Sequence, residues 1–242
     1  MTDLDGRVAL LTGASGGIGR ALGRRLIAAG VRTAFAYGSR ARQADELVAE
    51  SRAAGVDAAA FPGDLADPQV PMALLGATAE ALGPVDLLIA NAGHAVQLDY
   101  TDVDAATWER TMAVNLRAPF LLAQRALPGM VERGFGRVLF MSSVAGFTGG
   151  IVGPHYAASK AGLHGLVHYL AARVARRGVT VNALAPALIE DTGMLPATAS
   201  PDNLPVGRYG RPEEVADLAM AVLGNGFVTS QVMGVDGGAH PR

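Results

Sequence analysis

The chain has no cysteine among its 242 residues. This absence excludes disulfides, catalysis by a thiolate and zinc sites that use cysteine ligands. A formal net charge of −2 gives no electrostatic reason to expect nucleic acid or an anionic membrane surface as a partner. No apolar run approaches the ~20 residues that a membrane-spanning helix requires. The N-terminus lacks the basic and apolar segments of a signal peptide, so we expect a cytoplasmic protein.

Lysine is almost absent as well. The chain has 20 lysines and arginines, and Lys160 is the single lysine among them. It ends the segment YAASK, four residues after Tyr156. Arginine is always charged and forked, whereas lysine is a compact point charge with a tunable pKa. The use of lysine at this one position indicates that a point charge is needed there.

Short apolar runs alternate along the chain with longer amphipathic stretches. Their apolar residues are consecutive, which is typical of parallel strands buried on both faces. This succession predicts a Rossmann-type doubly wound seven-stranded parallel sheet with helices on both faces, formed by a single domain over residues 1–242. The predicted strands are 7–12, 32–37, 57–61, 85–91, 137–142, 179–184 and 231–236.

One long segment has no clear period. Residues 186–210 are rich in proline, glycine, serine, threonine and aspartate. Aperiodic stretches of this length inside a compact domain are usually functional. We therefore predict that this segment is a lid over the substrate.

Three glycines lie between the first predicted strand and the helix after it. Gly13, Gly17 and Gly19 follow a G-x3-G-x-G spacing, which differs from the G-x-G-x-x-G of the common dinucleotide fingerprint. A flexible surface loop is the alternative. The position of the glycines favours a tight turn that lets the backbone approach a pyrophosphate at the helix N-terminus.

The end of the second predicted strand distinguishes between the two common dinucleotides. An NAD site often has an acid here for the ribose 2′-hydroxyl, whereas an NADP site has an arginine for the 2′-phosphate. This chain has Tyr37 in place of the acid, followed by Ser39, Arg40 and Arg42. The pattern favours NADP(H), and the alternative is that both arginines are merely solvated at the start of a helix.

Tyr156 and Lys160 lie one helical turn apart and therefore on the same face. A nearby ammonium stabilises a phenolate, which makes tyrosine a better acid and base for a carbonyl or an alcohol. Ser143 follows the fifth predicted strand, at the sheet edge where ligands bind in this fold. The alternatives are a solvated polar helix face and a serine that only caps a turn.

Taken together, these motifs resemble the short-chain dehydrogenase/reductase family in its single-domain form, and 3-oxoacyl-[acyl-carrier-protein] reductases above all. The resemblance covers the whole chain. It rests on TGASGGIG (12–19), GDL (63–65), NAG (91–93), Asn115 in MAVNLRAPF, Ser143, YAASK (156–160), VTVNALAP (179–186), PVGRYGRPEEVA (205–216) and VDGG (235–238).

The resemblance implies a role for each catalytic residue. Tyr156 would be the general acid/base, and Ser143 would polarise the carbonyl. Lys160 would bind the nicotinamide ribose and lower the tyrosine pKa, while Asn115 would hold a water in a proton relay. The residues implied to bind NADP(H) are Gly13, Ser15, Gly17, Ile18, Gly19, Tyr37, Ser39, Arg40, Asp64, Leu65, Asn91, Ala92, Gly93, Tyr156, Lys160, Pro186 and Ile189.

The segment after Pro186 departs from the family pattern. Ala187 stands where the family usually has glycine, and Asp191 stands where it has a threonine near the nicotinamide. Either Thr192 shifts in by one place or the lid closes differently, so Ile189 is the preferred cofactor contact of the two.

The histidines give little sign of a metal site, and we predict none. His164 and His168 are four residues apart but have no acid at helical spacing beside them. His94 and His155 adjoin predicted site residues, so they either touch the substrate or fill the rim of its pocket. The resemblance also implies a homotetramer whose interface uses helices around residues 104–131 and 154–177.

We expect hydride transfer between NADP(H) and a small-molecule carbonyl or secondary alcohol. A 3-oxoacyl thioester, free or on a carrier protein, is one candidate substrate. The residues Arg133, Arg173, Arg176 and Arg177 either dock an acidic carrier protein or, as the preferred interpretation, are solvated at helix ends. The alternatives are a cyclic or aromatic ketone and a non-catalytic dinucleotide-sensing scaffold. The predicted substrate-lining residues are apolar: Val96, Val144, Phe147, Ile151, Val152, Leu188, Met194 and Leu195.

Overall fold

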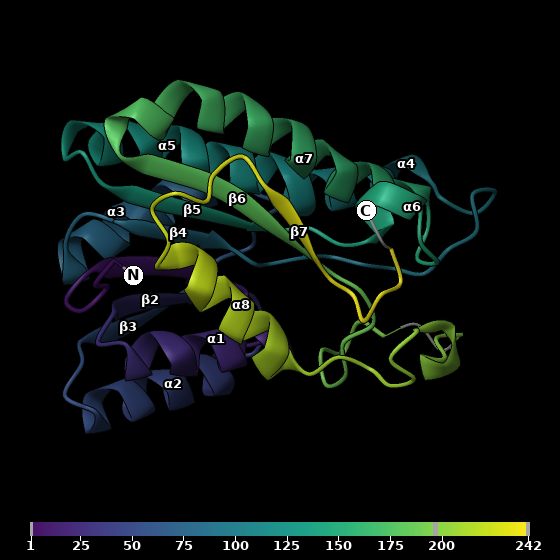
Figure 1. Ribbon diagram of the computed structural model, residues 1–242, viewed down its shortest axis with the longest axis horizontal. Coiled ribbons are helices and arrows are strands. Elements are labelled where there is room, and N and C mark those ends of the chain that lie inside the picture. The colour runs from purple at the N-terminus through teal and green to yellow at the C-terminus, as the bar shows by residue number, and fades with distance from the viewer. Residues whose placement is uncertain (1, 196–197, 241–242) are drawn as a thin grey trace.

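The computed structural model describes residues 2–195 and 198–240. Seven parallel strands form one sheet in the order β3-β2-β1-β4-β5-β6-β7 (Figure 1). The prediction of a seven-stranded doubly wound sheet is therefore confirmed, and each strand lies within two residues of its predicted bounds. The strands are β1 (Val8–Thr12), β2 (Arg32–Tyr37), β3 (Ala58–Pro62), β4 (Leu87–Ala90), β5 (Gly136–Met141), β6 (Val179–Pro186) and β7 (Val232–Val235).

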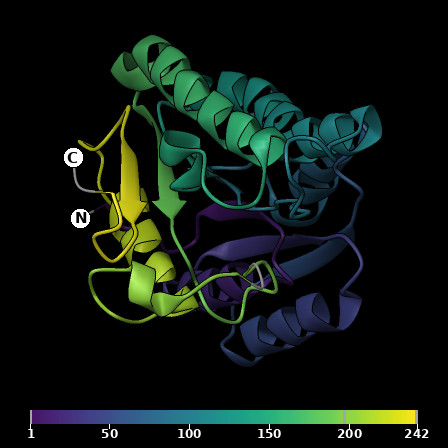
Figure 2. The same cartoon turned by 90° about the vertical axis from the view of Figure 1, so that its right-hand side faces the viewer.

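Helices cover both faces of the sheet (Figures 1 and 2). On one face lie α3 (Val70–Leu82), α5 (Ala118–Glu132) and α7 (Pro154–Val174), and on the other lie α1 (Gly17–Ala28), α2 (Ala41–Ala53) and α8 (Pro212–Leu223). The shorter elements are α4 (Ala105–Met112), the π-helix η1 (Ala113–Arg117), α6 (Ala145–Thr148) and the 3-10 turns η2 (Ala175–Arg177) and η3 (Pro201–Asn203). Within the described residues, no helix is long and apolar enough to cross a membrane.

Consecutive residues of each central strand contribute to two separate cores. Leu10 packs among the residues under α5 and α7, while its neighbour Leu11 packs among those under α1 and α8. Both leucines are fully buried, and burying one such side chain contributes roughly 1.5–3 kcal/mol. The double burial explains why the strands are continuous apolar runs.

The strand order indicates where on the sheet a ligand binds. β1 lies between β2 and β4, so the chain adds β2 and β3 on one side of β1 and then crosses over to add β4 to β7 on the other. In open parallel sheets, ligands bind beyond the carboxyl ends of the strands at such a switch point. The glycine turn after β1 and the segment after β4 both lie at this edge.

The predicted lid begins where β6 ends. In the described part of the chain between β6 and α8 the only regular element is η3. An isolated parallel bridge between Ile189 and Gly210 closes the base of this segment. Residues 196 and 197 lie outside the described residues.

Candidate active site

A cavity of about 570 Å³ opens at the carboxyl edge of the sheet. It is lined by Ser143, Tyr156 and Lys160 together with every residue that the sequence analysis assigned to the cofactor. Among the predicted catalytic and cofactor-binding residues, only Asn115 does not line it. The cofactor-assigned residues that the fold brings together here are Gly13, Ser15, Gly17, Ile18, Gly19, Tyr37, Ser39, Arg40, Asp64, Leu65, Asn91, Ala92, Gly93, Tyr156, Lys160, Pro186 and Ile189.

The glycine turn needs residues without side chains. Gly13 has a φ of +66°, and a Cβ there would lie 2.7 Å from the Cα of Ala92. A Cβ on Gly19 would overlap the carbonyl oxygen of Gly13. The N-cap residue of α1 is Gly16, which has no side chain that could cap the helix. The first turn of α1 contains no acidic residue either. The first-turn amides are therefore available to an anion at the positive end of the helix.

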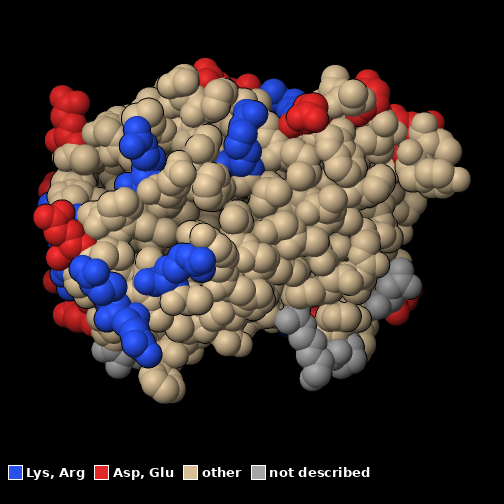
Figure 3. All heavy atoms as spheres, turned by 90° about the horizontal axis from the view of Figure 1, so that it is seen from above, with Lys and Arg blue, Asp and Glu red and all other residues tan. Residues whose placement is uncertain are grey.

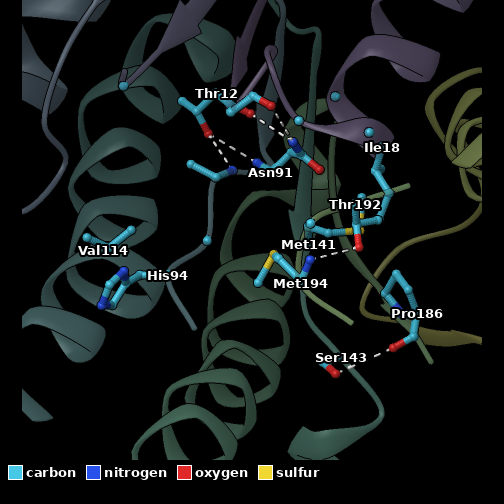
Figure 4. A pocket seen from close by; sticks show the side chains of 18 of the residues that line it. Thr12, Ile18, Asn91, His94, Val114, Met141, Ser143, Pro186, Thr192 and Met194 are labelled. Carbon is cyan, nitrogen blue, oxygen red and sulfur yellow. Dashed lines mark hydrogen bonds between the residues drawn. The ribbon is translucent and has the colours of Figure 1, made fainter. Parts of the chain in front are cut away.

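Thr12 and Asn91 tie this turn to the segment after β4. The Thr12 hydroxyl oxygen accepts from the backbone amides of Asn91 and Ala92, both at 3.1 Å. The Asn91 side-chain amide in turn donates to the carbonyl oxygens of Thr12 and Gly13 (Figure 4). The sequence analysis did not single out Thr12, because its role depends on the pairing of β1 with β4.

The two arginines after β2 have different surroundings. Arg40 lines the cavity beside Tyr37 and Ser39. Arg42 does not, and its Nε donates to the Glu46 carboxylate at 3.1 Å on the same helix. Of the two, only Arg40 is placed to meet a phosphate in the cavity.

Arg110 is a cavity residue that the sequence analysis missed. Its guanidinium lies 3.3 Å from the Asp64 carboxylate, and both side chains line the cavity. The Ala66 backbone amide, aided by the Arg110 charge, holds the pKa of Asp64 below its ordinary value. The pair joins α4 to the loop after β3, elements far apart in the sequence.

Lys160 is buried, with 3% of its surface exposed. Its Nζ donates to the Met141 carbonyl oxygen at 2.7 Å, at the end of β5. Burial lowers the pKa of Lys160 to about 8. An arginine would stay charged in this place at any physiological pH, so only lysine permits such an adjustment.

Tyr156 precedes Lys160 by one turn of α7 and is 8% exposed. Burial raises the pKa of its hydroxyl above the ordinary value. A hydrogen bond with the Ser143 side chain offsets part of this rise. The lowering of the tyrosine pKa by Lys160 that the resemblance implies stays a prediction. The Ser143 hydroxyl also donates to the Pro186 carbonyl oxygen at 3.4 Å (Figure 4).

Asn115 is fully buried within the π-helix η1. Its side-chain oxygen accepts from the His94 amide at 2.7 Å, and its side-chain nitrogen donates to the His94 carbonyl oxygen at 2.9 Å and to the Ser159 hydroxyl at 3.1 Å. These bonds fasten the segment after β4 to the helical face of the site. The water-holding role implied by the resemblance stays a prediction.

The apolar end of the cavity corrects two expectations. Phe147 does not line it, because its ring packs against His164 at 4.3 Å and His240 at 5.3 Å between centroids. Val96 does not line it either. The predicted apolar residues that do line it are Val144, Ile151, Val152, Leu188, Met194 and Leu195.

The histidines next to the site are not equivalent. His94 lines the cavity near Val114 (Figure 4). His155 is fully buried and does not belong to the rim, since its Nε2 lies 3.1 Å from the Val96 carbonyl oxygen. Across the described residues, no group of three or more metal-ligating side chains is found.

Thr192 also lines the cavity, although Ile189 was the preferred contact. Its hydroxyl donates to the Ile189 carbonyl oxygen at 3.1 Å and accepts from the Met194 amide at 3.2 Å. The turn containing Thr192 lies against Gly17, where a Cβ would be 3.2 Å from the Thr192 Cα. The lid segment and the glycine turn are thus in contact.

Known proteins resemble this chain over nearly its whole length. Residues 7–203 match the family model described as short chain dehydrogenase. A 3-oxoacyl-[acyl-carrier-protein] reductase of Synechocystis sp. is 35% identical, over 98% of this chain and 98% of the relative. A blue fluorescent protein from a metagenomic library, solved with NADPH, superposes with a TM-score of 0.92 at 36% identity, over 99% of this chain and 100% of its own. A short chain dehydrogenase from Burkholderia cenocepacia, solved with NADP, gives a TM-score of 0.90 at 34% identity, over 98% and 99%.

Proposed function

The chain belongs to the short-chain dehydrogenase family, and from this premise we propose that it is an NADP(H)-dependent oxidoreductase acting on a carbonyl or secondary alcohol. One observation carries the proposal. Ser143, Tyr156 and Lys160 line the same cavity as the glycine turn and Arg40. A proton-transfer group and a dinucleotide cradle in one cavity are what hydride transfer to a carbonyl requires.

The cradle fits NADP(H). The bare glycines and the amides at the start of α1 would hold the pyrophosphate, and Ser39 with Arg40 would hold the 2′-phosphate. Both solved relatives described above contain NADPH or NADP. When bound, the nicotinamide supplies or accepts the hydride.

The chain's own residues manage the proton. In reduction, the carbonyl carbon gains the hydride while the carbonyl oxygen takes the proton of the Tyr156 hydroxyl, which leaves a phenolate. In oxidation, the phenolate takes the alcohol proton back. Ser143 donates a hydrogen bond to the same oxygen, and the Lys160 ammonium offsets the phenolate charge.

The far end of the cavity suits a neutral, apolar substrate. The far end is lined by apolar residues that include Val144, Ile151 and Leu188. The cations among the described lining residues are Arg40, Arg110 and Lys160. A free carboxylate would have no cation to pair with there. We therefore propose a 3-oxoacyl thioester as the first candidate, in keeping with the name of the Synechocystis relative.

A carrier-bound acyl chain is part of this candidate. Arg133, Arg173, Arg176 and Arg177 lie at the C-terminal ends of α5 and α7, just before β5 and β6 begin, and therefore at the amino edge of the sheet. Figure 3 views the face that these helices cover and shows basic side chains gathered over one half of it. An acidic carrier protein would complement this charge, but docked there it would lie at the edge of the sheet opposite the cavity, so the position of these arginines favours solvated helix ends over carrier docking.

A cyclic or aromatic ketone would also suit the apolar lining. A non-catalytic dinucleotide sensor is the second class of function. It accounts less well for the site, because cofactor sensing needs no serine, tyrosine and lysine set in the cofactor cavity.

We further propose a homotetramer. A groove formed by α4, η1, α5 and α7 has an apolar floor of Met112, Leu116, Phe120 and Leu166, with Glu109 and Arg117 beside it. Light scattering would give four chain masses, whereas a single chain mass would refute this assembly. The cytoplasmic location stays a prediction, which cell fractionation tests.

The experiment is the loss of NADPH absorbance, with NADH in parallel and acetoacetyl-coenzyme A as acceptor. Rapid loss with NADPH alone supports the reductase, the cofactor and the acyl substrate together. Loss only with cyclic or aromatic ketones moves the substrate class. Tight NADPH binding without turnover on any ketone favours the sensor.

A further inference from the structure

The C-terminal segment turns back towards the active-site helices. The Asp236 carboxylate accepts from the backbone amides of Gly238 at 3.0 Å and His240 at 3.2 Å. This turn lays the His240 ring on the Phe147 ring, with centroids 5.3 Å apart and planes 10° apart. The segment from Asp236 to His240 therefore comes to lie beside α6 (Figure 1).

Phe147 also contacts α7, so it links His240 to this helix. Its ring lies 4.3 Å from that of His164, tilted by 35°. The approach of α6 to α7 is close, because a Cβ on Gly146 would lie 2.9 Å from His164 Cε1 and 3.0 Å from the Ala161 amide nitrogen. The His164 ring is thus enclosed between α6 and its own helix.

The inner edge of the His164 ring meets a buried serine. His164 Nε2 lies 2.8 Å from the Ser142 hydroxyl oxygen, and that hydroxyl donates to the Lys160 carbonyl oxygen at 3.0 Å. When the hydroxyl proton is directed at Lys160, the Ser142 oxygen is left to accept from the His164 tautomer that carries its proton on Nε2.

Ser142 is placed to control two catalytic residues at once. It directly precedes Ser143, and its hydroxyl holds the backbone of Lys160. The Lys160 Nζ donates to the carbonyl oxygen of Met141, the residue before Ser142, at 2.7 Å. The end of β5 and the catalytic turn of α7 are therefore joined at both the backbone and the side chain of the lysine.

We propose that His164 is a positioning residue for the Ser143–Lys160 pair, and that His240 at the chain's C-terminal end holds it in place through Phe147. The inference rests on the proposed function for its catalytic meaning. Without His164, Ser142 loses the donor that fixes its hydroxyl, and the spacing between β5 and α7 relaxes. Small misplacements of catalytic groups lower turnover by large factors.

The single lysine provides a readout that does not depend on turnover. Protein grown with lysine labelled with carbon-13 at Cε gives one lysine signal, that of Lys160. We compare His164→Leu with His168→Leu, a matched change one turn further along α7, where the His168 ring faces Ser230 instead. His164→Gln restores a donor.

The expected result is a shifted Lys160 signal in cofactor-free His164→Leu, an unshifted one in His168→Leu and near recovery in His164→Gln. Turnover falls roughly 10-fold in His164→Leu with KM nearly unchanged. A Lys160 signal and a kcat that match those of the wild type in folded His164→Leu would overturn the proposal.

His240 variants keep the proposal testable if His164→Leu does not fold. His240→Ala should shift the Lys160 signal in the same direction by less, while His240→Phe, which keeps the ring stack, should not shift it. An unshifted signal in His240→Ala refutes the C-terminal link. If wild-type protein reduces no ketone, the proposed function fails, whereas the lysine signal still decides the positioning.

Discussion

The Nζ of Lys160 lies 5.6 Å from the centre of the Tyr156 ring, one helical turn away on α7. Both side chains are buried, so the charge of either one is felt by the other with little screening by water. The predictions below follow from this relationship and from the cavity around it.

The first prediction concerns the ionisation of the lone lysine. Burial lowers its pKa from 10.5 to about 8, so the titration of the carbon-13 signal of Lys160 should have its midpoint near pH 8. The folded chain then holds fewer protons than the unfolded chain between about pH 8 and 10.5, so this residue's contribution to stability rises with pH across that window. A midpoint near 10.5 would contradict the buried placement.

Lys160→Arg should fold and yet lose most activity. The guanidinium is larger, forked and always charged, and it cannot reproduce the point contact between Nζ and the Met141 carbonyl oxygen. We expect kcat to fall roughly 100-fold, as for loss of a catalytic contact. Circular dichroism should stay unchanged, and near wild-type turnover would refute the assigned role of the lysine.

Tyr156→Phe should bind NADPH as the wild type does and lose turnover by roughly 10²–10⁴, the usual contribution of general acid–base catalysis. Tyr169→Phe is the control, because Tyr169 is on the same helix and is 56% exposed. Kinetics and fluorescence titration with NADPH measure the two effects separately. Near wild-type turnover of Tyr156→Phe would refute its role as the general acid/base, and a Tyr156→Phe variant that binds NADPH without turnover yet is fully functional in the cell would favour a sensor over an enzyme.

Arg40→Ala should weaken NADPH binding by roughly 10- to 100-fold, the value of a hydrogen bond between charged groups, and leave NADH binding nearly unchanged. Arg42→Ala should change neither, because Arg42 pairs with Glu46 outside the cavity. Fluorescence titration with both cofactors measures this. An Arg40→Ala variant that binds NADPH as tightly as the wild type would show that the 2′-phosphate is held elsewhere.

The sequence predicted most of the fold, because its evidence is local. Runs such as 7–12 are apolar on consecutive residues only because both faces of β1 are buried, and Gly13 and Gly19 are required wherever this turn forms. The choice between Arg40 and Arg42 was not available from local pattern. It depends on which of the two faces the cavity once α2 has packed.

What the sequence missed depends on contacts between distant segments. The π-helix η1 interrupts what is otherwise an α-helical pattern. It contains Asn115, whose side chain is fixed by hydrogen bonds with His94 and Ser159. The Asp64–Arg110 pair joins residues 46 positions apart. Phe147 is apolar and near the site in sequence, so it was predicted to line the substrate pocket. Its ring instead stacks on His240, which is 93 positions away along the chain.

The central claim is hydride transfer to a carbonyl carbon. The most direct test incubates the protein with NADPH that carries deuterium at both C4 positions and with the best acceptor of the ketone panel. The account predicts an alcohol with one deuterium on the former carbonyl carbon, formed by wild type and nearly absent with Tyr156→Phe. An alcohol without deuterium, or no alcohol from any ketone while NADPH binds, would contradict it.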